Sequence, residues 1–269
     1  MPVTVYPKGV TVHDRDNASP GFNLIQLPPE GGPTVGLIDL DGAVVHRWVL
    51  GGSLEKGAVP RARLLEDGRL LVLRADRAFG GCAQEYEWDG TLVWEYLPPE
   101  GLWPHHESHK PASDVIQDIS PDKRVVWEWH QYEHLNIERR VTVPASPDWW
   151  AGPENNTLVD WTHTNTVQAL PENKWFDAGD TRFKPGNVLM SLRQLDVVLL
   201  ADRDSGEIVW EYTGDYKGGL SGQHDSHMIE KGLPGEGNII LFDNGASPTE
   251  NLAHCGCSFV LEIDPTTKD

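Results

Sequence analysis

The stretch ADRDSGEIVWEY, residues 201–212, decides the fold that this sequence predicts. Its apolar residues alternate with polar ones on both sides of a turn containing Asp and Gly, which is the pattern of two antiparallel strands joined tightly. Variants of the phrase recur along the chain: LIDLDGAVVHRW (37–48), YEWDGTLVWEY (86–96), ISPDKRVVWEW (119–129) and the first half of a fifth copy, FVLEIDPTTKD (259–269). A recurring strand-turn-strand phrase predicts an all-β chain built from repeated units.

A second hairpin phrase precedes several copies of the first: LLEDGRLLVLR (64–74), ALPENKWFDAGDTRFKPGNVLMSLR (169–193) and GLPGEGNIILFDNG (232–245). The two phrases together make a unit of four short strands, and four-stranded units at ~40–50 residues are the repeat of a β-propeller blade. A β-sandwich whose hairpins merely look alike is the alternative. We favour the propeller because the whole phrase recurs, which a sandwich does not require.

Two intervals depart from this repeat. The third unit is too short for a full blade, and residues 130–160 form an insertion whose first part, HQYEHLNIERR (130–140), is compatible with a short helix. Long insertions in a propeller emerge at one face, where they often build a substrate wall. We therefore expect a single β-propeller domain over residues 1–269, incomplete, with an insertion at about 130–160 and a truncated C-terminal blade.

Composition narrows the range of partners. The 22 Lys and Arg residues stand against 41 Asp and Glu residues, so the formal net charge is −19. Nucleic acids and anionic lipid surfaces need clustered Lys and Arg, so we expect neither as a partner. No apolar run approaches the ~20 residues of a membrane helix. No leader is visible at the N-terminus, so the compartment stays open: periplasmic or secreted if a leader was removed, otherwise cytoplasmic.

Histidines gather at one place in the repeat, the start of the innermost strand of a blade. The motifs that carry them are HHESH (105–109), WTHTN (161–165) and GQHDSH (222–227). Because the first strand of every blade lines the central channel, we expect His106, His163 and His224 to converge. The second histidines, His109 and His227, lie three residues further on, so alternation along a strand predicts that they face the opposite side.

An arginine and several tryptophans accompany these histidines. Arg193 closes the inner hairpin of the fourth unit in SLRQLD, and Arg74 occupies the equivalent position of the second unit in VLRAD. An Arg at the channel end of a strand offers a planar fork of five donors for an oxyanion. Trp161 and Trp103, with Trp149 and Trp150 of the insertion, are candidate aromatic walls. Three other tryptophans are expected to fill the gaps between blades: Trp94, Trp127 and Trp210.

Several stretches together resemble the bacterial arylsulfotransferases of the aryl-sulfate sulfotransferase family. They are GVTVHDRDNASPGFNL (9–24), WEWH (127–130) with YEHLN (132–136), DWTHTN (160–165), SLRQLD (191–196), GQHDSHMI (222–229) and GEGNIILFDNG (235–245). The resemblance implies a six-bladed propeller and a ping-pong sulfuryl transfer between phenols that does not use PAPS. It implies no cofactor, a small aromatic sulfate as donor and a phenol as acceptor.

The same resemblance assigns roles to residues of this sequence. The sulfuryl group would ride on the histidine of the GQH element, His224. The other implied catalytic residues are His163, Arg193 and His106, and the implied substrate-binding residues are Asn165, His105, Trp161 and Asp225. A neutral imidazole is a competent nucleophile, and a covalent intermediate splits one hard transfer into two easier ones. Neither step demands a metal.

Two other functions stay open at this point. Three channel histidines with Asp225 or Glu107 would also suit Zn²⁺, Mn²⁺ or Fe²⁺ in a propeller lyase or hydrolase. The HCGC stretch (254–257) adds only a weak metal signal. Alternatively, the propeller is a noncatalytic binding module, because a fold does not fix a function. The sequence also leaves a homo-oligomer open.

Overall fold

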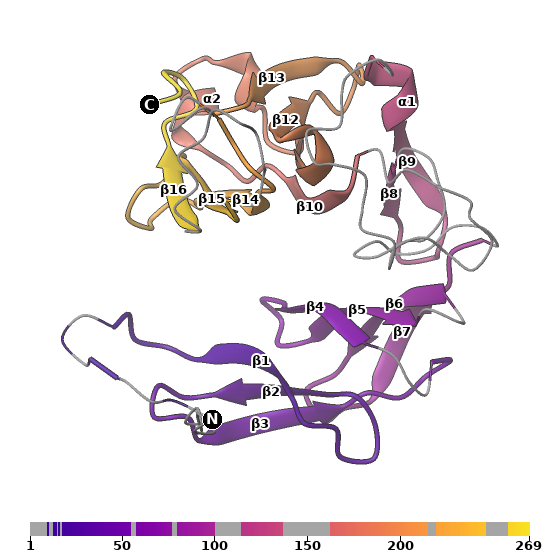
Figure 1. Ribbon diagram of the computed structural model, residues 1–269. Helices are drawn as coiled ribbons and strands as arrows, with labels where there is room; N and C mark the ends of the chain where they lie inside the picture. Colours follow the sequence, from indigo (N-terminus) through magenta and orange to yellow (C-terminus); the bar gives the residue numbers. More distant parts are fainter. Residues whose placement is uncertain are drawn as a thin grey trace, which may run out of the picture. The chain divides into compact units, whose positions relative to one another are not determined.

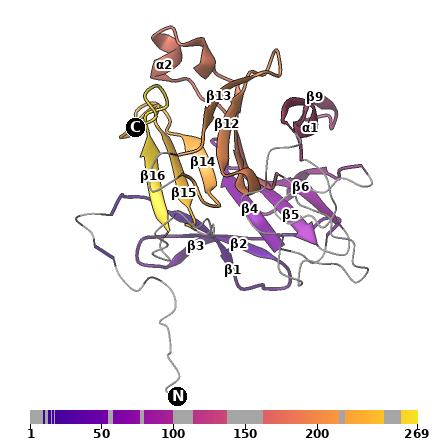
Figure 2. The ribbon, with the colours of Figure 1, turned by 45° about the horizontal axis from the view of Figure 1, so that its top comes forward.

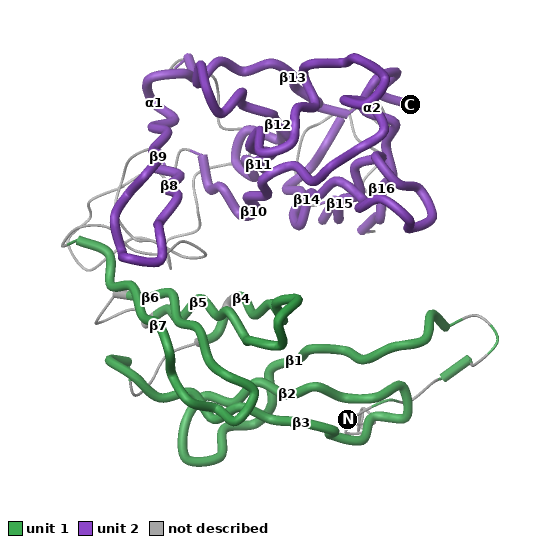
Figure 3. The backbone as a smooth tube through the Cα atoms, turned by 180° about the vertical axis from the view of Figure 1, so that it is seen from behind, with its two compact units in different colours: residues 1–105 green, residues 106–269 purple. Residues whose placement is uncertain are grey.

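The computed structural model describes residues 10, 13–14, 16, 18–54, 58–76, 80–99, 114–136, 162–214, 219–245 and 258–269. The chain divides into two compact units, residues 1–105 and residues 106–269 (Figure 3). Each unit has its own antiparallel sheets and its own apolar core. In the described part of the chain, no helix is both long enough and apolar enough to cross a membrane.

Unit 1 holds two sheets whose strands follow one another in chain order (Figure 1). The first has three strands: β1 (Asn23–Leu27), β2 (Thr34–Ile38) and β3 (Val44–Val49). The second has four: β4 (Ala58–Leu64), β5 (Leu70–Asp76), β6 (Gly80–Tyr86) and β7 (Leu92–Tyr96). Each strand pairs antiparallel with its neighbour in sequence, so every connection within a sheet is a hairpin.

Unit 2 holds three sheets and several short helical turns. The sheets are β8 (Val115–Ile119) and β9 (Val125–His130); β10 (Thr164–Ala169), β11 (Val188–Leu192), β12 (Val197–Ala201) and β13 (Ile208–Tyr212); and β14 (His224–Met228), β15 (Ile239–Asp243) and β16 (Phe259–Ile263). The helical turns are α1 (Gln131–His134), α2 (Lys174–Asp177), η2 (Thr181–Phe183) and η3 (Arg193–Leu195). The four-stranded and three-stranded sheets stand side by side (Figure 2).

The repeated phrase forms the same hairpin in four of the five sheets. ADRDSGEIVWEY contributes the end of β12, the turn and β13, and the earlier copies contribute β2–β3, β6–β7 and β8–β9. The expectation of an all-β chain with four-stranded antiparallel sheets of the blade type is therefore confirmed. The short helix at the start of the insertion is also present, as α1. Closure of the sheets into one propeller over residues 1–269 stays a prediction.

Aspartates shape the turns of these hairpins. The carboxylate of Asp202 accepts hydrogen bonds from the backbone N–H groups of Asp204 at 3.1 Å and Ser205 at 2.8 Å. These bonds lower the pKa of the Asp202 carboxyl. Gly206 then takes a φ of +77°, in the left-handed region that side chains disfavour. Asp at the start and Gly in the left-handed position explain why the phrase contains both.

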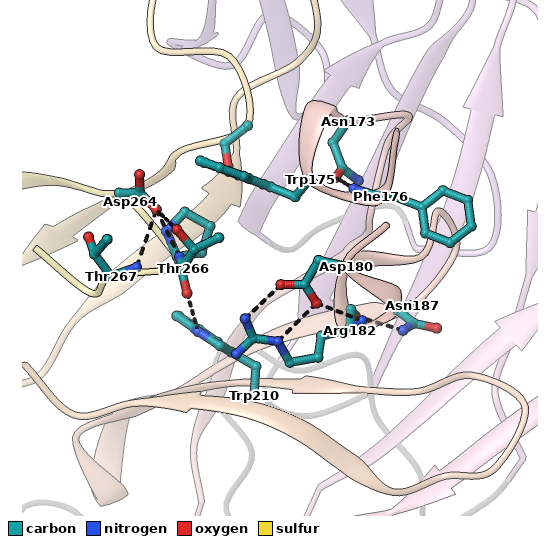
Figure 4. A network of polar contacts seen from close by, with 12 residues as sticks. Asn173, Trp175, Phe176, Asp180, Arg182, Asn187, Trp210, Asp264, Thr266 and Thr267 are labelled. Carbon is teal, nitrogen blue, oxygen red and sulfur yellow. Dashed lines mark hydrogen bonds and ion pairs between the residues drawn. The ribbon is translucent and has the colours of Figure 1, made fainter. Parts of the chain in front are cut away.

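The tryptophan that ends the phrase ties one sheet to the next. The indole N–H of Trp48 on β3 donates to the Glu87 carbonyl, in the β6–β7 turn, at 3.0 Å. Trp129 on β9 donates to Gly206 at 2.8 Å, and Trp210 on β13 donates to Pro265 at 2.8 Å (Figure 4). In all three contacts the donor is on the last strand of a sheet; the acceptor is in the last hairpin turn of the following sheet for Trp48 and Trp129, and in the turn after β16 for Trp210.

The expected place of Trp127 and Trp210 between sheets is confirmed. Trp127 donates to the Arg203 carbonyl at 2.9 Å and the Arg203 guanidinium lies over its ring, 5.2 Å from the centroid. Trp210 belongs to the apolar cluster shared by β10–β13 and β14–β16. Every residue of β11 and β12 is buried, because apolar clusters cover both faces of their sheet. This rigid sheet carries the candidate site at one of its ends.

Candidate functional site

The first strands of the two largest sheets in unit 2 run alongside each other. The side-chain amide of Asn165, on β10, donates to the backbone carbonyl of Gln223 at 2.7 Å, just before β14. Further along, Gln168 accepts from the backbone N–H of Met228 at 2.7 Å and donates to its carbonyl at 3.4 Å. These contacts bring the WTHTN and GQHDSH motifs to the same end of the two sheets.

Gln223 anchors the start of β14, a role that the sequence did not reveal. Its side chain is fully buried, and its amide N–H group donates to the carbonyls of Leu192 at 3.1 Å and Val197 at 2.9 Å. The same amide lies 3.3 Å from the Ser191 hydroxyl. Because these partners end β11 and begin β12, the residue before His224 is held against the rigid neighbouring sheet.

One hydrogen bond sets the protonation of His224. Its Nδ1 lies 2.9 Å from the carbonyl oxygen of Gly222. A carbonyl oxygen only accepts, so Nδ1 carries the proton and the lone pair of the neutral ring is on Nε2. The side-chain nitrogen Nδ2 of Asn244 lies 3.2 Å from the same Nδ1. The shorter contact to the Gly222 carbonyl decides the tautomer, and with a proton on Nδ1 the Asn244 amide is a partner only in its flipped orientation, with the oxygen toward the ring. The ring is partly exposed.

Two buried carboxylates hold the loop before His224. Asp196 accepts from the backbone N–H of Gly222 at 2.7 Å. Asp243, at the end of β15, accepts from the backbone N–H of Ser221 at 3.1 Å and of Gly245 at 3.0 Å. Burial raises the pKa of the Asp243 carboxyl, the two backbone hydrogen bonds oppose that rise, and the charge of Asp196 adds to it. The loop is thus fixed residue by residue.

A third carboxylate holds His163 from both sides. Asp114 accepts from the hydroxyl of Thr162 at 2.9 Å and from the backbone N–H of Thr164 at 2.6 Å. Gln131 of α1 also donates to the Thr164 hydroxyl. His163 itself is only 5% exposed. The start of the insertion therefore supports this histidine.

Arg193 begins its turn directly beside His163. Its backbone N–H donates to the His163 carbonyl at 3.1 Å, so both side chains start at the same end of the sheet. The Arg193 side chain is partly exposed. Among the described residues its guanidinium has one hydrogen bond, to the Gln194 side chain at 3.4 Å. Within the part of the chain that the structure describes, this contact uses one of the five donors of the fork.

Backbone strain is concentrated here. Five described residues other than glycine have positive φ, and three of them are His163 at +48°, Asp196 at +46° and Asp225 at +54°. Both first strands are also irregular: the pairing shifts between Thr164 and Thr166 and again between His224 and His227. Such conformations cost of order 1–3 kcal/mol each and cluster at functional sites.

The irregularity in β14 overturns one expectation. His224 pairs with Phe242 and His227 pairs with Ile240, so two residues of β14, Asp225 and Ser226, oppose the single residue Leu241 of β15. Paired residues share a face, and Phe242 and Ile240 lie two apart, so His224 and His227 lie on the same face. The prediction that His227 faces the opposite side was wrong. In a regular strand, residues three apart point to opposite faces, but the extra residue of the bulge at Asp225 and Ser226 returns His227 to the face of His224.

Of the residues assigned from the sequence, the structure brings His163, Asn165, Arg193 and His224 to one end of adjacent sheets. The amide of Asn165 is engaged with the backbone of Gln223, and the side chain of Asp225 is exposed. The remaining candidates lie outside the described residues: His105, His106, Trp161, Trp103, Trp149, Trp150, His109 and the HCGC stretch. Within the described part, no three His, Cys, Asp or Glu side chains are grouped to hold a metal ion.

The supporting residues Asp114, Asp196, Gln223 and Asp243 were missed by the sequence analysis. Their partners lie at least 22 residues away in every case but one, so local patterns do not expose them. Two signals were nevertheless present. Gln223 directly precedes the assigned nucleophile, and Asp196 closes the same SLRQLD phrase that carries Arg193.

Solved structures with similar folds are distant. A protein of unknown function from Bacteroides caccae has a TM-score of 0.49 at 14% identity, covering 93% of this chain and 71% of that one. The β-propeller domain of Cps50 (Swd1) from Myceliophthora thermophila has a TM-score of 0.42 at 13% identity, covering 97% of this chain and 76% of that one. A catalytically inactive virginiamycin B lyase from Staphylococcus aureus with quinupristin has a TM-score of 0.25 at 11% identity, covering 90% and 60%. With TM-scores below 0.5, none of these likenesses establishes the fold or activity of this chain.

No curated protein matches the sequence significantly. A family model, in contrast, matches residues 102–269, which is more than half of the chain and includes the whole of the site described above. The description of that model is arylsulfotransferase (ASST). The chain therefore belongs to the arylsulfotransferase family.

Proposed function

We propose that this protein transfers a sulfuryl group from an aryl sulfate to a phenol through a sulfohistidine on His224, without PAPS. The observation that carries the proposal is the hydrogen bond from His224 Nδ1 to the Gly222 carbonyl at 2.9 Å. It keeps the neutral ring in the form whose lone pair is on Nε2, which is the form that a nucleophilic imidazole requires. Family membership supports the sulfotransferase class of the reaction.

The first half of the reaction forms one bond and breaks one. His224 Nε2 attacks sulfur, an N–S bond forms, and the S–O bond to the donor breaks with its electron pair leaving on the phenolate oxygen. The ring becomes a sulfo-imidazolium whose proton stays on Nδ1, hydrogen-bonded to the Gly222 carbonyl. The departing phenolate takes a proton from a neighbouring acid, and His163 is the assigned candidate for that acid.

The second half reverses these changes. The acceptor phenol gives its proton to the same neighbouring group as its oxygen attacks sulfur. The N–S bond then breaks and its electron pair returns to Nε2. We assign the balancing of charge on the three sulfuryl oxygens to the Arg193 guanidinium, because its planar fork of donors suits an oxyanion. We assign further contacts to these oxygens to Asn165 and His106, and contacts to the aryl group to His105, Trp161 and Asp225.

The test uses p-nitrophenyl sulfate as donor and phenol as acceptor. We expect release of nitrophenol that depends on the acceptor, and, without acceptor, a protein mass increased by one sulfuryl group that maps to the peptide containing His224. His224→Gln should lose both signals. His46→Gln is the matched control, since His46 lies on β3 of unit 1 and bonds to the Trp88 carbonyl. Turnover that persists in His224→Gln, or turnover without a sulfated protein, would overturn the proposal.

A further inference from the structure

The Gly222 carbonyl, which accepts the hydrogen bond from His224 Nδ1, is held in place by contacts to the neighbouring sheet. Gly222 has a φ of +70°, which only glycine adopts readily, and its carbonyl accepts from His224 Nδ1 at 2.9 Å. Its own N–H group is bound by Asp196 at 2.7 Å. The residue after it is also held, since the Gln223 carbonyl accepts from Asn165 at 2.7 Å and from Ser191 at 3.4 Å. The position of the Gly222 carbonyl is thus determined from outside its own loop.

Asp196 differs from the other supports because it belongs to the turn that carries Arg193. The turn η3 spans Arg193 to Leu195, and the backbone N–H of Asp196 donates to the Arg193 carbonyl at 3.3 Å. Asp196 adopts the left-handed conformation with φ +46° and ψ +49° to end this turn. Its side chain is nevertheless buried and faces Gly222. One residue therefore joins the guanidinium of the site to the loop of the histidine.

We infer that Asp196 is a positioning residue, which sets the protonated nitrogen of His224 and the spacing between His224 and Arg193. The inference rests on the proposed function of His224. A carboxylate that holds Gly222 keeps its carbonyl beneath Nδ1, so the proton stays there and Nε2 stays the nucleophile. Orientation of this kind is a familiar task of buried groups behind a reacting histidine. Small misplacements of reacting groups cost about 10²-fold in rate.

The left-handed backbone decides which substitutions are informative. Alanine at φ +46° would add strain of its own, whereas glycine accepts this conformation and only removes the carboxylate. Asparagine also tolerates it and keeps an oxygen that accepts from the Gly222 N–H. Asp196→Gly therefore deletes the contact, and Asp196→Asn retains it without the charge. Asp243→Asn is the matched control, because Asp243 is a buried carboxylate that holds Ser221 rather than Gly222.

Two measurements test the inference on the full chain. The first is the ¹⁵N chemical shifts of the His224 ring, which report the protonated nitrogen and do not depend on turnover. We expect the Nδ1–H form in the wild type, in Asp196→Asn and in Asp243→Asn, and a mixture of both neutral forms in Asp196→Gly. The second is p-nitrophenyl sulfate turnover, for which we expect kcat to fall roughly 100-fold in Asp196→Gly and only a few-fold in Asp196→Asn. KM for the donor should change little in either.

The outcomes separate the inference from the proposed function. A wild type without sulfuryl transfer removes the proposed function, while the ring shifts still test the role of Asp196. An Asp196→Gly protein that keeps the Nδ1–H form would overturn the inference, whatever its activity. If Asp196→Gly does not fold, Asp196→Ala, which also removes the acceptor, takes its place. A retained Nδ1–H form in Asp196→Ala would then overturn the inference, and a mixed form would support it.

Discussion

Arg74 in unit 1 and Arg193 in unit 2 occupy the same place in the repeated phrase, and the structure uses them in opposite ways. Arg74 is fully buried. Its guanidinium donates to the Gly51 carbonyl at 2.9 Å, to the Gln84 side chain at 3.2 Å and to the Leu54 carbonyl. Arg193 is partly exposed, and among the described residues its guanidinium has one hydrogen bond, to Gln194. One arginine is a structural support and the other presents a charge.

The difference arises from the residues that follow each arginine. After Arg74 the strand continues to Asp76, so the side chain stays within the sheet and points into the unit. β11 ends at Leu192, and the chain then forms the turn η3. Asp196 takes a left-handed conformation and ends that turn. The turn places Arg193 beyond the end of the strand. The repeated phrase therefore places an arginine at the same position in both sheets. The next three residues determine whether its side chain is buried or exposed.

Replacing Arg193 gives the largest expected effect on activity. We expect Arg193→Ala to lower kcat for sulfuryl transfer by roughly 10²–10³-fold, the usual cost of losing one positioned oxyanion donor. The midpoint of thermal unfolding should stay close to that of the wild type, because the side chain is partly exposed. Arg193→Lys keeps the charge without the planar fork and should fall between the two. An Arg193→Ala variant with the kcat of the wild type would contradict the functional contrast between Arg193 and Arg74.

Replacing Arg74 should affect stability instead. Arg74→Met removes three hydrogen bonds, and the Leu54 carbonyl loses the donor that Arg74 supplied, while the Gly51 carbonyl and the Gln84 side chain keep donors from neighbouring side chains. We expect the free energy of unfolding to fall by about 3 kcal/mol. Urea unfolding followed by circular dichroism measures this. Turnover per folded molecule should be unchanged at temperatures where the variant remains folded. A variant as stable as the wild type would show that Arg74 is not a structural support.

The environment of Arg74 also predicts an unreactive thiol. Burial, assisted by the charge of Glu95 and opposed by that of Arg74, raises the pKa of Cys82 from 9.0 to about 11. The thiolate population at a given pH is then lower by about 10²-fold, and alkylation slows accordingly. Labelling with iodoacetamide in a Cys255→Ser, Cys257→Ser background measures this, with the same protein in urea as the control. Labelling at the rate of a small thiol would show that this region of unit 1 is open.

The bulge in β14 predicts a pair of neighbouring imidazoles in unit 2. His224 and His227 share a face, and each Nδ1 is engaged with the carbonyl two residues earlier, at 2.9 Å and 3.0 Å. Because the Nδ1 atoms are engaged, we expect the two Nε2 atoms to bind one Cu²⁺ ion, a metal that suits imidazole. We expect His227→Ala to weaken this binding by about tenfold in a titration followed by electron paramagnetic resonance. His46→Ala is the control, and equal effects of the two substitutions would contradict the shared face.

The smallest expected effect concerns the pH dependence of stability. Because the folded pKa of Asp243 is raised above the ordinary value of 3.8, the folded state holds this proton more tightly than the unfolded state. The free energy of unfolding therefore falls as pH rises from 3.8 through the raised value, and then levels. Asp243→Asn lacks this loss, so its stability relative to the wild type should increase over that interval. Urea titrations at a series of pH values measure it, and parallel curves would contradict it.

Much of the fold could be predicted because its signals are local. Each hairpin follows from apolar alternation around an Asp and Gly turn, and the tryptophans between sheets follow from their place at the end of the phrase. The pairing of the WTHTN and GQHDSH motifs was predictable as well, since both begin a sheet. These inferences needed only the period of the sequence.

The remainder depended on contacts between distant residues and on the backbone. The bulge at Asp225 reverses the side on which His227 lies, and nothing in HDSH announces an extra residue. The contact between Asp196 and Gly222 joins positions 26 residues apart. Arg74 and Arg193 looked alike until the course of the chain after each was known. Alternation rules assume regular strands, and this site is built where the strands are irregular.

The tryptophan contacts between sheets have a consequence for synthesis of the chain. The carbonyl that accepts from each indole is synthesised later than the tryptophan: 39 residues later for Trp48, 55 for Trp210 and 77 for Trp129. A newly made sheet thus keeps its indole in water until the following hairpin has left the ribosome. Completion of each sheet is thereby coupled to the arrival of the next, and a pause in translation between them would leave that indole N–H without its protein acceptor.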